Sequence, residues 1–438
     1  MKFSTNNIIR LSRILPVIFI SISPVFAFPK SASRLINDSP KEVIDQVWQI
    51  IYRDYLTSIG NYNSKEWFEL RKKVLSNRYY EQVDAYEAIK GMLSTLEDPY
   101  TRFLDPKEFS EMRIDTTGRL SGIGIQISMD KDSKDLLVVS PIEGSPAFQA
   151  GIMANDIIFS IDGKSTEGMD MSEAVNLIRG KEGTSVTLGI NRKKRFFNVT
   201  LVRARIEISS VVSRINNTKY EIKIGYLRLK QFNSNAPKDM KKAIIKLENE
   251  NPSGYILDLR GNPGGLLESS ILIARQWINQ GIIVTTRNGD GVDEVRKANG
   301  RALTDKPVVV LVDQGSASAS EILAGAIQDN KRGVLVGKKT FGKGLVQSVR
   351  PLVDGSGLTV TVAKYLTPKG TDINKYGIKP DFEAALKPYK GKQVTAFDLG
   401  TNRDSQYIFA ETLLIRDMHK QFNKISFFGR LEKNTFSL

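Results

Sequence analysis

Apolar residues at helical spacing mark the N-terminal part of the chain. They recur every three or four positions over Val43–Ile51 and again over Ala85–Leu96, as on one face of a helix. Ser39-Pro40-Lys41-Glu42 precedes the first run with a capping-box pattern and a proline at the first helical position. We therefore expect a small helical domain over residues 28–115, with its aromatic residues packed in the core.

The pattern changes near Gly118, where short apolar runs separated by glycine-rich turns begin. Such runs are typical of strands, and one helical stretch interrupts them. The strand-like runs are 121–127, 136–140, 156–163, 186–191 and 196–203, and the helical stretch is 172–179. The segment 116–205 is therefore predicted to be a compact domain built mainly of strands.

Strands and helices alternate between residues 206 and 389. The sequence predicts a strand over Tyr255–Leu259, a turn over 260–265, a helix over Leu266–Asn279, a strand over Pro307–Val312, and a serine-rich turn with a helix to about Asn330. This alternation indicates a layered α/β domain with a largely parallel sheet. Functional loops in such sheets lie at the carboxyl ends of strands, and both turns occupy that position. Residues 390–438 form a C-terminal tail to which the sequence assigns no role.

The N-terminus has the parts of an export signal. Basic residues precede an apolar run over Ile14–Ile22, and Val25-Phe26-Ala27 has the small-residue pattern of a cleavage site. We expect a signal peptide over residues 1–27, although Pro16 and Pro24 interrupt the run and leave an uncleaved anchor as the alternative. Export predicts a bacterial periplasm or a thylakoid lumen. The absence of cysteine from all 438 residues fits either compartment.

The formal charge of +15 is spread along the chain. Its one dense run, Arg192–Arg195, falls where a hairpin turn is predicted. A nucleic-acid-binding protein would cluster such charges with aromatic residues, so no nucleic acid partner is expected. An anionic membrane surface stays open as a peripheral contact.

The numbers of histidine and cysteine residues limit which kinds of hydrolase this chain can be. The chain has one histidine, His419, far out in the tail, and no cysteine. A Ser-His-Asp triad therefore lacks a well-placed base, and a Cys-His pair or a cysteine-ligated zinc is excluded. A serine activated by a neutral lysine is the remaining nucleophilic option.

Three serines lie at the start of the helix predicted after Val312. Ser316, nearest the turn, suits the helix N-cap. Ser318 would then lie in the first helical turn, where amide dipoles favour a developing alkoxide, with the N–H of Ala319 beside it. Asp329 lies 11 residues on, three helical turns, and so shares the face of Ser318. The sequence leaves the choice between Ser318 and the other two serines, Ser316 and Ser320, open.

Lys343 is the lysine best placed to act as a base. Unlike Lys338 and Lys339, it lies between glycines, which allow a close backbone approach. It precedes the strand predicted over Gly344–Pro351, in which Gln347, four positions on, falls on the same face. To act near neutral pH, the lysine needs its pKa lowered by about 3 from about 10.4, through burial.

An oxyanion would need two preorganised donors. The N–H of Ala319 is one candidate, and Gly264, in the turn Asn262-Pro263-Gly264-Gly265, can supply the other because it carries no side chain. A plain strand-to-helix turn is the alternative interpretation of this Pro-Gly-Gly sequence.

Two linked phrases stand out within residues 116–205, Gly144-Ser-Pro-Ala-Phe-Gln-Ala-Gly151 and Asp156-Ile-Ile-Phe-Ser-Ile-Asp-Gly163. On these phrases the segment resembles a bacterial-type PDZ domain. The resemblance implies that N–H groups around Gly122 and Gly124 receive a terminal carboxylate and that the strand from Ile123 through Ile125 pairs with an extended peptide. The alternative is that these glycines only shape a turn.

The motifs together resemble those of the carboxyl-terminal processing peptidases, which are Ser-Lys proteases with an internal PDZ domain. The matching segments are Asp258-Leu-Arg-Gly-Asn-Pro-Gly-Gly265, Gly315-Ser-Ala-Ser-Ala-Ser-Glu-Ile322 and Gly342-Lys-Gly-Leu-Val-Gln347. The resemblance covers nearly all of the mature length. It implies a crotonase-like layered α/β protease core over 206–389, with the PDZ domain inserted after the N-terminal helical domain.

The resemblance also assigns roles to residues. Ser318 would be the nucleophile, Lys343 the general base and Gln347 the residue that orients the lysine. Gly264 and Ala319 would form the oxyanion hole, and Asp329 matches an acidic position with a supporting role.

The implied function is that of an exported serine endopeptidase that needs no metal or cofactor and cleaves near the C-terminus of a protein. Trp48, Trp67 and Asp98-Pro-Tyr-Thr-Arg-Phe-Leu104 look most like the cyanobacterial and chloroplast branch, which implies the photosystem II D1 precursor as substrate. A monomer is the working expectation. The competing hypotheses are a non-catalytic PDZ scaffold and a relative that binds apolar small molecules.

Overall fold

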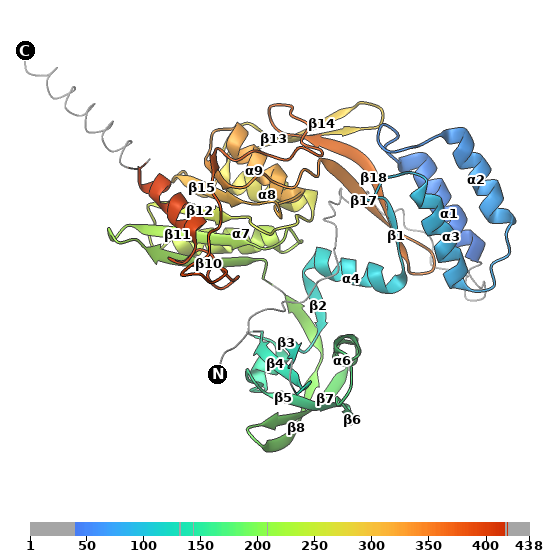
Figure 1. Ribbon diagram of the computed structural model, residues 1–438, viewed down its shortest axis with the longest axis horizontal. Coiled ribbons are helices and arrows are strands. Elements are labelled where there is room, and N and C mark those ends of the chain that lie inside the picture. Colours follow the sequence, from blue (N-terminus) through green and yellow to red (C-terminus); the bar gives the residue numbers. More distant parts are fainter. Residues whose placement is uncertain (1–39, 131–132, 143, 208, 417, 419–438) are drawn as a thin grey trace, which may run out of the picture. The chain divides into compact units, whose positions relative to one another are not determined.

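The computed structural model describes residues 40–130, 133–142, 144–207, 209–416 and 418 (Figure 1). The predicted signal peptide, 1–27, and His419 lie outside the described residues. The chain divides into two compact units, one made of Met1–Thr116 with Ser209–Leu438 and the other of Thr117–Ile208. None of the helices in the described ranges is both long and apolar enough to cross a bilayer.

A six-stranded sheet forms the centre of the larger unit and confirms the predicted parallel arrangement. Only its first pair of neighbours is antiparallel. In spatial order its strands are β10 (Val211–Asn217), β11 (Lys223–Leu229), β12 (Gly254–Asp258), β15 (Val308–Val312), β16 (Val334–Gly337) and β19 (Phe382–Glu383).

Helices cover both faces of this sheet, which explains why its strands are continuously apolar. Tyr255 and Leu257 pack into one cluster beneath α7 (Ala236–Glu248), α8 (Leu267–Trp277) and α9 (Ala319–Asp329), which lie side by side in Figure 1. Ile256, which points the other way because strand residues alternate, packs against the helix over 405–416. The segment predicted as a tail therefore supplies one of the layers.

A second, antiparallel sheet of five strands lies in the same unit. The long β18 (Gly357–Leu366) is its hub and pairs with three of the others. Those are β17 (Leu345–Pro351), β13 (Ile282–Asn288), which also pairs with β14 (Asp293–Lys297), and β1 (Arg102–Leu104) from the N-terminal region.

The N-terminal helices share a core with this second sheet. The helices that share it are α1 (Pro40–Asp54), α2 (Ser64–Ser76) and α3 (Gln82–Ser94), while α4 (Pro106–Thr117) follows β1 along the chain. The cluster around Trp48 and Trp67 also contains Leu358 and Val360 of β18. The helical region predicted over 28–115 thus completes its core with strands that come some 250 residues later in the sequence.

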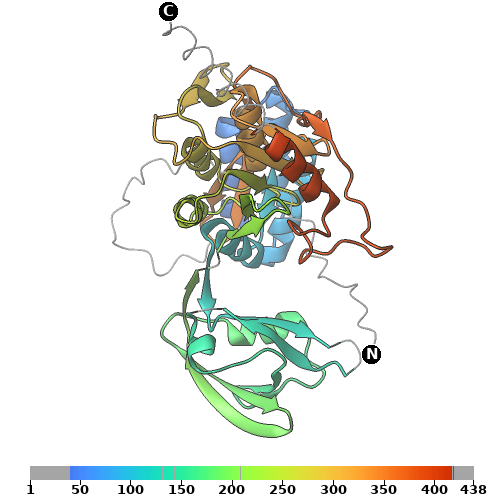
Figure 2. The same ribbon diagram turned by 90° about the vertical axis from the view of Figure 1, so that its left-hand side faces the viewer.

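The smaller unit, coloured cyan to green in Figure 2, has the strand pattern predicted for a PDZ domain. Strands β2 (Arg119–Gly122) and β9 (Ala204–Glu207) pair with each other. A separate sheet has the strand order β3 (Ile125–Met129), β4 (Leu136–Pro141), β5 (Ile157–Ile161), β7 (Ser185–Arg192) and β8 (Arg195–Val202). The short β6 (Lys164–Ser165) pairs with β5. The helices of this unit are α5 (Pro146–Gln149) and α6 (Met171–Ile178). The Arg192–Arg195 run forms the β7–β8 hairpin turn, as predicted.

Candidate active site

The structure separates the three serines that the sequence could not rank. Ser316 Oγ donates to the carbonyl of Leu259 (2.8 Å), and Ser320 Oγ donates to the carbonyl of Asn262 (2.9 Å). Ser318 Oγ is buried and has no hydrogen-bond partner among the described residues. The prediction that Ser316 caps the helix was wrong, because α9 begins at Ala319 and Ser318 itself occupies the N-cap position.

The backbone of Ser318 has an uncommon conformation, with φ 62° and ψ −116°. A non-glycine residue with positive φ costs on the order of 1–3 kcal/mol and persists only where its surroundings hold it. Here the N–H of Ser318 donates to the Glu321 carboxylate (2.8 Å), and its carbonyl accepts from the Tyr365 hydroxyl (3.1 Å). These bonds fix the sharp turn that places Ser318 before the helix.

Lys343 is fully buried, and its amine has no hydrogen-bond partner in the described part of the chain. Its Nζ lies 4.5 Å from the centre of the Tyr100 ring. Burial, helped by the positive charge of Arg102, lowers the pKa of Lys343 well below its usual value, although Asp98 and Glu321 act in the opposite direction. A neutral amine is what a lysine base requires.

Glu321 holds together the turn before α9, here called the serine turn (residues 315–318), and the segment 340–343 that carries Lys343. Its buried carboxylate accepts four hydrogen bonds, from the N–H groups of Ser318 (2.8 Å), Gly342 (2.8 Å) and Lys343 (2.9 Å) and from Thr340 Oγ1 (2.6 Å). Burial raises the pKa of Glu321 above its usual value, and these bonds act against the rise. The hydroxyl of Tyr365 makes a second link, because it reaches the carbonyls of both Ser318 and Lys343.

Replacing Glu321 with glutamine should lower kcat about 100-fold and destabilise the fold by about 2–3 kcal/mol. A glutamine amide turns one of the two oxygens into a donor that faces N–H groups, so charge-assisted bonds are lost on one side. Steady-state kinetics and thermal denaturation would measure both effects.

Glu268 provides the matched control for this substitution. It also lies in the first turn of a helix, α8, but pairs with Arg296 at the surface, where its side chain is 40% exposed. Glu268→Gln should leave kcat within about twofold, since surface ion pairs contribute little. Equal effects of the two variants would contradict the linking role of Glu321.

Gln347 is buried on β17, opposite Thr361 of β18. Its Nε2 lies 3.4 Å from Thr361 Oγ1, which in turn donates to Asp98 (2.7 Å), while its Oε1 has no partner among the described residues. The strand-spacing argument for Gln347 does not apply, because β17 begins at Leu345, after Lys343, and a register shift separates Val346 from Gln347.

Gly264 lies directly against the serine turn. Its φ is +100°, and a Cβ built there would lie 2.8 Å from Ser318 Cβ and 2.9 Å from the nitrogen of Ala319. A larger residue would therefore collide with the turn. The N–H of Gly264 donates to Asn262 Oδ1 (2.9 Å), while Ala319, the first residue of α9, has no intrahelical acceptor for its N–H.

Asp329 is not brought to this group. It is the last residue of α9, about 16 Å along the helix from Ser318 at about 1.5 Å per residue. Its carboxylate accepts from the N–H of Lys369 (3.0 Å) and lies 3.5 Å from Lys369 Nζ. The prediction that Asp329 shares the face of Ser318 left out that the two residues lie at opposite ends of α9.

The predicted peptide-binding residues lie together in the smaller unit. Ile123 is buried and its carbonyl accepts from the N–H of Ala147 (2.9 Å). Gly124 has φ +75° and its carbonyl accepts from the N–H of Ile142 and from Ser145 Oγ. Gly122 ends β2 and Ile125 opens β3, which is an edge strand within the described part of its sheet.

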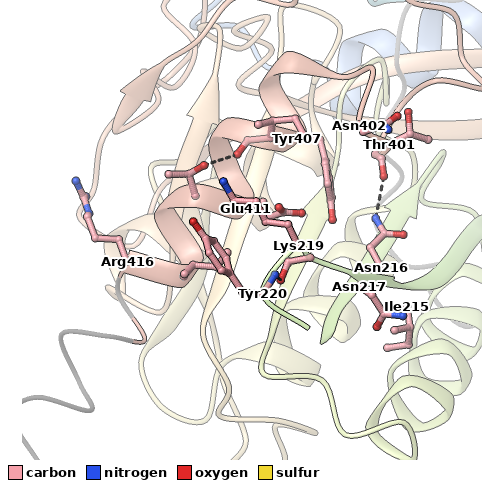
Figure 3. A pocket seen from close by; sticks show the side chains of 15 residues that line it. Ile215, Asn216, Asn217, Lys219, Tyr220, Thr401, Asn402, Tyr407, Glu411 and Arg416 are labelled. Carbon is pink, nitrogen blue, oxygen red and sulfur yellow. Dashed lines mark hydrogen bonds between the residues drawn. The ribbon is translucent and has the colours of Figure 1, made fainter. Parts of the chain in front are cut away.

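A separate cavity of about 1070 Å³ lies between the β10–β11 turn and the helix over 405–416. Figure 3 shows Tyr407 and Glu411 of the helix on one side and Lys219 and Tyr220 of the turn on the other. None of the residues predicted to act in catalysis lines it.

Sequence reasoning missed the residues that hold the site. Glu321 belongs to the motif Gly315–Ile322. The available signal was that an acidic residue occurs among the apolar residues at the start of a helix. Tyr100 and Asp98 belong to the segment 98–104, which the sequence linked only to the cyanobacterial and chloroplast branch of the family. Tyr365 carried no signal, because only the fold brings β18 beside the serine turn.

Two known protein families match parts of this chain, and named relatives match most of it. Peptidase family S41 matches residues 223–384, and the PDZ domain matches residues 137–192. The carboxyl-terminal-processing protease of Synechocystis sp. is 42% identical over 387 residues, covering 87% of this chain and 88% of that protein. The chloroplastic carboxyl-terminal-processing peptidase 2 of Arabidopsis thaliana is 38% identical over 400 residues, covering 87% of this chain and 76% of that protein.

A solved structure agrees with these relatives. The photosystem II D1 C-terminal processing protease has a TM-score of 0.51 and 35% identity, covering 79% of this chain and 93% of that one. The sequence relatives cover most of both proteins, so the agreement is not confined to one domain. The chain belongs to peptidase family S41 and, within it, to the carboxyl-terminal-processing serine endopeptidases.

Proposed function

We propose that Ser318 is the nucleophile of this peptidase and that Lys343 is its general base. The observation that carries the proposal is that Ser318 Oγ and Lys343 Nζ are buried, make no hydrogen bonds to described residues and belong to segments held by one carboxylate, Glu321. Buried polar groups without partners are rare and tend to mark functional sites. Gln347, whose Oε1 has no partner among the described residues, is the proposed orienting residue for the lysine.

The proposed reaction proceeds through an acyl-enzyme. The neutral Lys343 amine takes the proton of Ser318 as Oγ forms a bond to the scissile carbonyl carbon, and the resulting ammonium gives that proton to the leaving amine as the peptide bond breaks. Water then attacks the ester in the same way, returning Ser318 Oγ–H and the free acid. The low dielectric around Lys343 favours the neutral amine at the start of each half-reaction.

The oxyanion site is proposed to use the N–H groups of Ala319 and Gly264. The start of α9 adds the positive end of the helix dipole to the Ala319 donor. The Gly264 N–H is bonded to Asn262 Oδ1 in this structure, so its use requires the oxyanion to replace that acceptor. Asp329 has no direct part in this scheme, because its side chain contacts Lys369.

The proposed substrate is the C-terminal extension of the photosystem II D1 precursor, because a solved relative is named for that processing. Relatives from cyanobacteria and chloroplasts support action in the thylakoid lumen or the periplasm. The substrate C-terminus is proposed to bind at Gly122–Ile125, with the tail pairing to the edge of β3. Peripheral contact with a membrane and a monomeric state stay predictions. Family membership leaves no support for a non-catalytic scaffold or a small-molecule-binding relative.

Converting the terminal carboxylate of a tailed substrate to an amide tests the proposed recognition. Loss of charge-assisted hydrogen bonds worth about 1.5–3 kcal/mol should lower kcat/KM roughly 10- to 100-fold. The comparison uses acid and amide forms of one peptide with the wild-type enzyme. Equal rates would reject carboxylate recognition and leave the Ser318–Lys343 chemistry untouched.

A further inference from the structure

A buried ion network lies where β12 ends and the turn toward Gly264 begins. Arg260 is 4% exposed and contacts two aspartates, Asp258 and Asp404, whose residues are fully buried. Its Nη1 and Nη2 lie 3.0 and 2.6 Å from the two oxygens of Asp404, while Nε donates to Asp258 (2.9 Å). Nη1 also donates to Gln406 Oε1 (2.8 Å). The guanidinium thereby connects the end of β12 to residues 144 and 146 positions later.

Asp404 is held in place from its own side of the network. Its Oδ1 accepts from the N–H groups of Gln406 and Tyr407 (both 3.1 Å), as an N-cap does at the start of the helix over 405–416. Its Oδ2 accepts from the N–H of Gly400 (2.8 Å). The position of this carboxylate is therefore fixed by the C-terminal segment and not by Arg260 alone.

Hydrogen bonds connect the residues after Arg260 to the serine turn, so the position of Arg260 affects that turn. The N–H of Gly261 donates to Asp313 (2.8 Å), and the carbonyl of Asn262 accepts from the N–H of Ala317 (3.1 Å) and from Ser320 Oγ (2.9 Å). Gly264 then packs against Ser318. Only three residues thus separate Arg260 from Gly264, the proposed oxyanion donor, and two of them bond directly to residues 313–320.

We propose that Asp404 is a positioning residue for catalysis, which acts through the side chain of Arg260 to hold the turn 260–264 against the serine turn. The C-terminal segment is then part of the catalytic apparatus, although it contributes no group to the substrate. The proposal rests on the proposed function for the roles of Gly264 and Ser318. Misplacing an oxyanion donor lowers kcat and has little effect on ground-state binding.

The first test compares Asp404→Asn with Asp398→Asn in the full mature enzyme. Asp398 belongs to the same segment and pairs with Arg403 (3.1 Å), whose side chain is 60% exposed. On a tailed substrate, Asp404→Asn should lower kcat about 10- to 100-fold with KM within about twofold, and Asp398→Asn should leave both within about twofold. The assay is run at a temperature where circular dichroism shows both variants fully folded.

Gln406→Ala keeps the test decisive if Asp404→Asn does not fold. It removes one acceptor of Arg260 without changing the charge of the network, and should lower kcat about 3- to 10-fold with KM unchanged. Stability changes alone would lower the melting temperature and leave kcat per folded enzyme at the wild-type value. That result, in Asp404→Asn or in Gln406→Ala, overturns the proposal.

The outcome is distinguishable from failure of the proposed chemistry. A Ser318→Ala variant that still cleaves the substrate would reject Ser318 as nucleophile, whatever Asp404→Asn does. An inactive Ser318→Ala variant together with an unchanged kcat in Asp404→Asn would reject only the positioning role.

Discussion

Replacing Ser318 with alanine should abolish cleavage of a tailed substrate, with kcat lower by roughly 10⁵–10⁶-fold, as for other enzymes that lose a covalent nucleophile. Because Ser318 Oγ makes no hydrogen bond to described residues, its removal should leave the melting temperature nearly unchanged. Mass spectrometry of a tailed protein substrate, before and after incubation, would measure the loss.

Ser316 and Ser320 are the controls that the turn itself provides. Each donates its hydroxyl proton to a main-chain carbonyl, so alanine at either position should cost about 1 kcal/mol of stability and keep kcat within about tenfold of the wild type. The ranking of the three variants is the informative result. If Ser316→Ala or Ser320→Ala were the inactive variant, a different serine would be the nucleophile.

Replacing Lys343 with methionine should have the second largest effect, a loss of about 10⁴-fold or more in kcat together with a gain in stability. The thioether has nearly the length of the lysine chain, so the site keeps its packing, but the base is gone. The buried amine has no hydrogen-bond partner among the described residues, and replacing it should raise the free energy of unfolding by about 1–3 kcal/mol.

The pH dependence of both quantities checks this prediction. Since the neutral amine is the base and the pKa of Lys343 is lowered well below 10.5, kcat/KM of the wild type should rise as pH rises through the lowered pKa and then level off. Between the folded pKa and that of the unfolded chain, the unfolded state binds the extra proton, so the stability of the wild type rises with pH. The difference in stability between wild type and Lys343→Met should shrink accordingly. A constant difference, or activity unchanged down to pH 4, would contradict a lysine base.

Much of the fold followed from local patterns in the sequence. The continuous apolar runs over Tyr255–Leu259 and Pro307–Val312 predicted buried parallel strands, and β12 and β15 occupy them. The PDZ domain over 116–205 was recognisable from two local phrases, Gly144–Gly151 and Asp156–Gly163. Such signals are local, so they can be recognised without knowing the long-range contacts of the chain.

The contacts that build the site could not be predicted in the same way. The start of α9 after Ser318 depends on a positive φ that Glu321 and Tyr365 hold, whereas cap propensity alone does not distinguish Ser318 from Ser316, two residues earlier. Tyr100 covers Lys343 only because β1 pairs with β18. Asp404 was assigned to a tail because its role depends on Arg260, 144 positions earlier. Pairings across such distances leave no periodic trace in the sequence.

The shared core of the N-terminal helices and β18 has a consequence for when this enzyme can become active. Thr101 and Thr361, 260 residues apart, bond to each other beside Asp98, and Tyr100 then lies over Lys343. A ribosome that adds about 5–20 residues per second needs roughly 13–50 s to make the intervening chain. Until β18 (Gly357–Leu366) has been made, the strand pairing that holds Tyr100 over Lys343 cannot form. A chain that ends before β18 therefore cannot complete the surroundings of Lys343, even though Tyr100 and Lys343 are already present.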